Sequence, residues 1–143
     1  MMLNVRVKGT PKAQPRPRAF ARGGKARVYD PGTAEGWKSA VATAFHPFAG
    51  KYFNEPVHVL MTFYLPRPKG HFGTGRNAEV LKDTSPTYHT QKPDCDNLAK
   101  AVMDCLSCIG FWRDDCLVIS LTVKKMWDTN SQNGPGARII IHD

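Results

Sequence analysis

The sequence predicts an α+β fold, a two-layer sandwich of a small mixed or antiparallel sheet and two helices in the order β-α-β-α-β-β. Three observations lead to this class. Apolar and polar residues alternate over residues 3–8, apolar residues recur at helical spacing over 33–48 and 97–109, and runs rich in β-branched residues follow each helical segment. At 143 residues we expect one domain, spanning 1–143.

The first half of the chain gives one strand, one helix and a second strand. Residues 3–8 predict a strand with one face in the core. The proline-rich and basic residues 9–27 predict an extended, positively charged loop, because proline cannot donate a ladder hydrogen bond. Thr33 is the expected N-cap of a helix over 33–48. A mostly buried strand is expected over 57–65.

The second half begins with a long irregular segment, 66–91, which is rich in basic residues, proline and glycine. Such loops are typical either of a segment that wraps a ligand or of a mobile insertion, and both interpretations stay open. A second helix is expected over 97–109, with Leu98, Val102, Cys105 and Ile109 on one face. Strands over 116–126 and 137–141 follow, and their short connection predicts an antiparallel hairpin.

Charge is unevenly distributed along the chain. The net charge is +8, and 15 of the 20 Lys and Arg residues lie in the first 92 residues. A basic body joined to an acidic segment suits a protein that attracts a polyanion and holds a cation. No apolar run approaches the length of a membrane-spanning helix, and the N-terminus has no stretch like a signal peptide, so we expect a cytoplasmic protein.

Five of the twelve acidic residues fall within 22 positions, and all are aspartates: Asp94, Asp96, Asp104, Asp114 and Asp115. Short carboxylate side chains suit a rigid site for a hard cation. Alternatively, Asp96 is a helix cap and Asp114 and Asp115 form a turn. A helix of about 13 residues spans about 20 Å, so its periodicity does not bring Asp115 to Asp94 and Asp96.

Four cysteines also lie close together in the sequence, and Cys105 and Cys108 form a C-x-x-C pair. This pair allows a zinc site or a disulfide. However, the outer cysteines do not supply a second pair of ligands at the usual spacing. Small buried residues are the alternative, because free cysteine is often buried.

The motifs around the acidic residues resemble those of the RusA-type Holliday-junction resolvases, including phage and prophage members. The resemblance rests on Lys92-Pro-Asp-Cys-Asp-Asn-Leu-Ala-Lys100, then Asp104, then Gly110-Phe-Trp-Arg-Asp-Asp115 with Val118 three residues later, and then Lys125-x-Trp127. It extends to the N-terminal Arg16-Pro-Arg18 segment. About a dozen fixed positions in order make this match specific.

The resemblance implies a homodimer that cleaves four-way DNA junctions with Mg²⁺, for which Mn²⁺ is a possible substitute. It implies that Asp94, Asp96 and Asp115 are the metal ligands and that Lys100 is important for activity. The alternatives are a metal-dependent nuclease for other branched DNA or for RNA, and a DNA-binding protein without catalysis. The 66–91 segment is longer than in compact family members.

Other residues are candidates for supporting roles. We expect Asp104 to support Lys100, which otherwise forms a surface ion pair with Asp96 or Asp104. Asp114 and His89 are further supporting candidates, although His89 could equally be a solvated loop residue. Trp112 either stacks on a base or anchors the core. Residues expected to grip phosphates are basic: Arg16, Arg18, Arg22, Lys25, Arg27 and Lys92.

Overall fold

The structure is a computed structural model that describes residues 1–15, 18–22, 25–29, 34–130 and 132–143. It contains a four-stranded mixed sheet and two α-helices, so the predicted α+β class is confirmed. The strands of this sheet are β1 (Met2–Lys8), β4 (Val57–Leu65), β5 (Val118–Trp127) and β6 (Gly136–His142), and the helices are α1 (Glu35–Phe45) and α2 (Cys95–Cys108). None of the described helices is long and apolar enough to cross a membrane.

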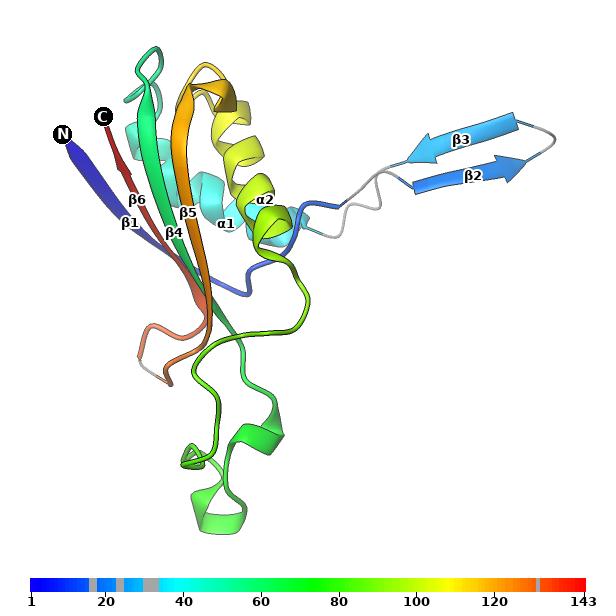
Figure 1. Cartoon of the computed structure of the whole chain (residues 1–143), viewed down its shortest axis with the longest axis vertical. Helices are drawn as coiled ribbons and strands as arrows, with labels where there is room; N and C mark the ends of the chain where they lie inside the picture. The colour runs from blue at the N-terminus through cyan, green and yellow to red at the C-terminus, as the bar shows by residue number, and fades with distance from the viewer. Residues whose placement is uncertain (16–17, 23–24, 30–33, 131) are drawn as a thin grey trace.

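The strand order is β1-β6-β4-β5, with β4 and β5 parallel and the other pairs antiparallel. The predicted hairpin between the last two strands is therefore wrong, since β4 lies between β5 and β6. Parallel neighbours need a long crossover connection, and α2 supplies it between β4 and β5. Figure 1 shows α2 beside β5, with the two chain ends close together on the neighbouring strands.

The core lies between the sheet and the helices. Alternate residues of β4 are buried and only Leu60 among the others is exposed, so the mostly buried strand that we expected is confirmed. Trp37 and Val41 of α1 and Leu98 and Val102 of α2 complete the core. These helical positions recur every three to four residues, which explains why both segments form amphipathic helices.

One of the two predictions about irregular segments needs correction. Residues 18–29 include a second, two-stranded sheet, formed by β2 (Arg18–Arg22) and β3 (Lys25–Tyr29), where we expected an extended loop. Figure 1 shows this hairpin projecting away from the four-stranded sheet. The long segment after β4 is irregular, as predicted, apart from two short 3₁₀ helices, η2 (Lys69–His71) and η3 (Gly75–Asn77). The predicted cap Thr33 lies outside the described residues.

Candidate active site

Two of the predicted metal ligands lie at the start of α2. Asp94 is the N-cap residue, and its main-chain carbonyl accepts the Leu98 N–H at 3.1 Å. Asp96 lies in the first helical turn, where its Oδ1 accepts the main-chain N–H of Asn97 at 2.9 Å. Because α2 starts at Cys95, earlier than predicted, the cap residue is Asp94 and not Asp96. The positive end of the helix dipole stabilises both negative charges.

Asp115 reaches the same helix by a chain reversal. Gly110 has a φ of 73°, a left-handed conformation that glycine adopts readily, and the Phe111 N–H is bonded to the Leu106 carbonyl at 3.0 Å. Asp115 then begins the short 3₁₀ helix η4 (Asp115–Leu117). Oδ2 of Asp115 lies 2.9 Å from Nζ of Lys100. Lys100 lies on α2, one helical turn beyond Asp96. The two acidic segments therefore meet along α2.

The contact between Lys100 and Asp115 changes the acidity of both groups. The hydrogen bond from Lys100 lowers the pKa of Asp115, partial burial opposes this, and Asp114 contributes a smaller lowering. The same hydrogen bond raises the pKa of Lys100. The side chain of Lys100 is 51% exposed and that of Asp115 is 28% exposed, so water screens their attraction. At neutral pH the site holds an ionised carboxylate beside an ammonium group.

We expect Lys100→Met to raise the pKa of Asp115 toward the ordinary aspartate value of about 4. The pair stabilises the folded chain above that value, and this contribution is lost as the pH falls through the lowered pKa of Asp115. At the alkaline end it is lost as the pH rises through the raised pKa of Lys100. Carbon-13 NMR of the Asp115 carboxyl measures the titration directly.

Because the pair is exposed, Lys100→Met should cost less than about 1 kcal/mol of stability at neutral pH and nothing in strong acid. Lys51→Met is the matched control, since Lys51 is an exposed lysine in the turn after α1. An Asp115 titration that is the same in wild type and Lys100→Met would contradict the contact.

The acidic site comprises Asp94, Asp96, Lys100 and Asp115, and its donors suit a hard divalent cation. All three acidic members are carboxylates, the ligand type that Mg²⁺ takes in proteins. Within the described part of the chain, however, no three His, Cys, Asp or Glu side chains form a group close enough to hold one ion. The residues therefore fit Mg²⁺ by the type of their donor atoms and not by their spacing. In this structure Lys100 is the counter-ion of Asp115.

Other predicted supporting residues occupy different positions. Oδ2 of Asp104 accepts a hydrogen bond from Nζ of Lys38 on α1 at 3.1 Å, and the negative charge of Asp104 is a lesser cause of the raised pKa of Lys100. Asp114 is the N-cap residue of η4, and its main-chain carbonyl accepts the Leu117 N–H. His89 is not a solvated loop residue, since it is only 6% exposed and its ring lies 4.4 Å from that of Trp127.

The cysteines do not share one role. All four are free thiols, and only Cys105 is fully buried, with its Sγ 3.3 Å from the Lys38 carbonyl oxygen. Cys95 is partly buried, while Cys108 and Cys116 are exposed. Packing in the core therefore accounts for Cys105 and not for the whole set.

The basic residues expected to grip DNA lie in two places. Lys92 has its Nζ 4.0 Å from Oδ2 of Asp94, next to the acidic site. The register of the hairpin pairs Arg18 with Tyr29 and Arg22 with Lys25, with Arg27 opposite Phe20. Since opposed positions of an antiparallel pair share a face, these four basic positions belong to one face of the hairpin. Arg16 lies outside the described residues.

Sequence reasoning gave no role to Lys125, although it belongs to the Lys125-x-Trp127 motif. Its Nζ donates to the main-chain carbonyls of Gln91 at 2.6 Å and Pro93 at 2.8 Å. Lys125 therefore fixes the segment that leads into Asp94. Those acceptors are main-chain oxygens, so no pattern of side chains could have indicated the contact.

Comparison with known proteins identifies the class as an endodeoxyribonuclease, a hydrolase acting on DNA phosphodiester bonds. The family model described as "Endodeoxyribonuclease RusA" matches residues 8–142. The chain therefore belongs to the RusA endodeoxyribonuclease family. The family resolves Holliday junctions and depends in general on a divalent metal. The chain is also 33% identical over 122 residues to the uncharacterized protein YqaN of Bacillus subtilis strain 168, covering 85% of this chain and 84% of that protein.

Proposed function

We propose that this chain resolves four-way DNA junctions by Mg²⁺-dependent hydrolysis of one phosphodiester in each of two opposed strands. The observation that carries the proposal is the contact of Asp115 with Lys100, because it joins the second acidic segment to the helix that bears Asp94 and Asp96. Those three carboxylates would have to draw closer together than they lie in this structure to hold the metal. When bound, Mg²⁺ lowers the pKa of a coordinated water and neutralises charge that develops on the phosphate oxygens.

The side chains of the protein have separate tasks in this proposal. Lys100 places a positive charge among the carboxylates, where it can pair with a non-bridging oxygen of the scissile phosphate. Lys92 beside Asp94, together with the basic face of the β2–β3 hairpin, offsets phosphate charge along the arms. Such contacts fix the position of the DNA without reading its bases. A homodimer would present two acidic sites to a two-fold symmetric junction.

The test compares three labelled substrates of the same strand composition, namely a four-way junction, a flap and a linear duplex. We expect the full chain with Mg²⁺ to cut the junction at paired, symmetric positions and to leave the duplex intact. Omitting the divalent ion should abolish cutting while leaving junction binding in place, because the basic residues bind phosphate without it.

Two results would overturn the proposal. Equal cutting of all three substrates would make the chain a nuclease without junction specificity. Junction binding with no cutting at any concentration of Mg²⁺ or Mn²⁺ would make it a binding protein. Sedimentation of the same preparation measures whether the cutting species is a dimer.

A further inference from the structure

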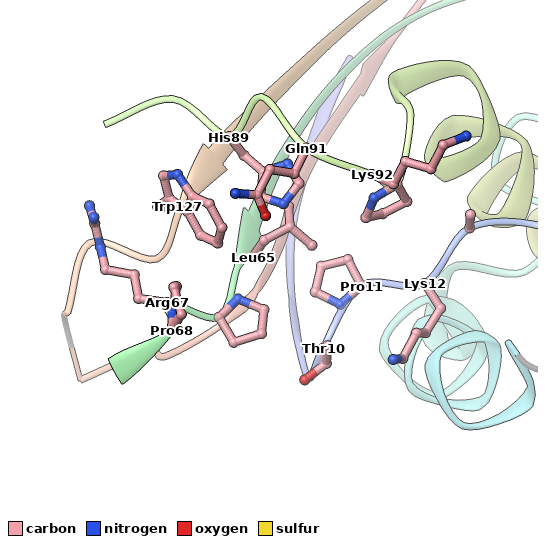
Figure 2. Close-up of a pocket in the computed structure, with 13 residues that line it drawn as sticks. Thr10, Pro11, Lys12, Leu65, Arg67, Pro68, His89, Gln91, Lys92 and Trp127 are labelled. Carbon is pink, nitrogen blue, oxygen red and sulfur yellow. The ribbon is translucent and has the colours of Figure 1, made fainter. Parts of the chain in front are cut away.

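A pocket of about 510 Å³ lies beside the start of α2. Its walls come from the segment after β1, the ends of β4 and β5, and residues 89–93, which lead directly into Asp94. Figure 2 shows Lys12 and Lys92 at one side of this pocket and Arg67 and Trp127 at the other, with Gln91 and His89 between them. We call it the His89 pocket.

The walls of the His89 pocket are fixed by hydrogen bonds. Nζ of Lys125 donates hydrogen bonds to the main-chain carbonyls of Gln91 and Pro93. The main-chain N–H of Trp127 donates to the Thr87 carbonyl at 3.0 Å. The Gln14 N–H donates to the Asn97 carbonyl at 2.9 Å and ties the segment after β1 to α2. A ligand would meet a preformed site, which reduces the entropy lost on binding.

The lining combines flat apolar surfaces with positive charge. Leu65, Trp127 and several prolines provide the apolar part, while Lys12, Lys92 and Arg67 provide the charge. Among the described residues that line the pocket there is no aspartate or glutamate. This composition suits a ligand with a flat, weakly polar body and a negative flank. It does not suit a cation or a purely apolar molecule.

Two side chains offer hydrogen bonds to such a ligand. His89 is nine-tenths buried, and among the described residues no group bonds to its Nδ1. Burial, and then the nearby charge of Lys125, lower the pKa of His89, so its ring is neutral at neutral pH and has one donor and one acceptor nitrogen. Gln91 adds an amide, which has two donors and an acceptor.

We infer that the His89 pocket receives one unstacked nucleobase of the cleaved strand, with His89 and Gln91 along its edge and Lys12 and Lys92 on the flanking phosphates. This inference rests on the proposed function. Because Pro93 forms a wall of the pocket and Asp94 is the next residue, a strand crossing the acidic site passes the pocket mouth. Bases at a branch point are more easily unstacked than bases within a duplex, and an unstacked base can enter a protein pocket that hydrogen-bonds to its edge.

The test moves a single abasic nucleotide through the positions that flank the cut in a four-way junction. For the wild type we expect a loss of cutting of about tenfold at one position, the size of one lost base–protein stack, and little loss elsewhere. In Gln91→Ala the abasic penalty at that position should shrink and the preference among the four bases there should weaken. Gln91 is exposed and its bond to Lys125 uses the main chain, so the fold is retained.

Gln132→Ala is the matched control, since Gln132 is an exposed glutamine in the loop between β5 and β6. It should keep the full abasic penalty and base preference. If wild type and Gln91→Ala show the same penalty at every position, the inference is wrong. If Lys92→Ala weakens all junctions equally while Gln91→Ala changes nothing, the pocket contacts phosphate alone. If the wild type cuts no junction, the proposed function fails and this inference fails with it.

Discussion

Asp96→Asn should reduce cleavage of a four-way junction by about 100- to 1,000-fold while leaving junction binding intact or tighter. A loss of this order is typical when one group that stabilises charge in the transition state is removed. The substitution preserves size and removes a carboxylate from the first turn of α2, where a metal ligand is proposed. Binding should not suffer, because a negative charge near the phosphates has been removed. Single-turnover cutting with Mg²⁺ and gel-shift without it give the two readouts.

Asp143→Asn is the control for this prediction. Asp143 is exposed and its carboxylate pairs with the N-terminal amine at 2.6 Å, far along the chain from α2. Its substitution should leave cutting within about twofold, since exposed ion pairs contribute little. Cutting by Asp96→Asn at the wild-type rate would show that the proposed ligand set is wrong, whatever the substrate.

The elements with a strong hydrophobic period could be predicted from the sequence. Residues 3–8 alternate and form most of β1, and the apolar stripe through Leu98 and Val102 marks α2. Helical spacing likewise identified α1 around Trp37 and Val41. In each case one face of the element is buried and the other is not, so the sequence carries the same period as the structure.

The pairing of strands could not be predicted in the same way. The two-residue period of apolar positions identifies a strand but not the strand that it pairs with. The short connection after β5 suggested a hairpin, whereas β6 pairs with β1 and β4. The β2–β3 hairpin was missed because the prolines before it indicated a loop. Its strands alternate basic or aromatic positions with Ala and Val, a two-residue period that was available in the sequence.

The sequence proposed the residues of the candidate site but not their geometry. Asp94, Asp96 and Asp115 were found by density and by the family motif, whereas the helix length argued against their meeting. The structure brings Asp115 to Lys100 because Gly110 reverses the chain and Phe111 and Trp112 pack into the core. That return depends on tertiary packing. Lys38 holds Asp104 for the same reason, because α1 and α2 pack together only in the folded chain.

Trp112→Ala should lower the free energy of unfolding by about 3–5 kcal/mol, the usual cost of removing a large aromatic side chain from a core. Trp112 is 0% exposed, its ring centroid lies 5.4 Å from that of Phe111, and its Nε1 donates to Oγ of Ser107 at 2.9 Å. The core role is thus the one observed, and a completely buried ring is not available to stack on a base. Urea unfolding followed by circular dichroism measures the change.

Phe53→Ala separates this effect from a general loss of aromatic surface. Phe53 is 45% exposed, and its main-chain carbonyl accepts the Arg113 N–H whatever its side chain. Its truncation should cost less than about 1 kcal/mol. A typical domain has only about 5–15 kcal/mol of stability, so Trp112→Ala also loosens the reversal that carries Asp115 to Lys100. Cutting by Trp112→Ala should therefore recover when stability is restored by cooling or an osmolyte, because a completely buried side chain offers no surface to DNA. If Trp112→Ala is as stable as the wild type but loses affinity for the junction, Trp112 is instead a residue that contacts DNA.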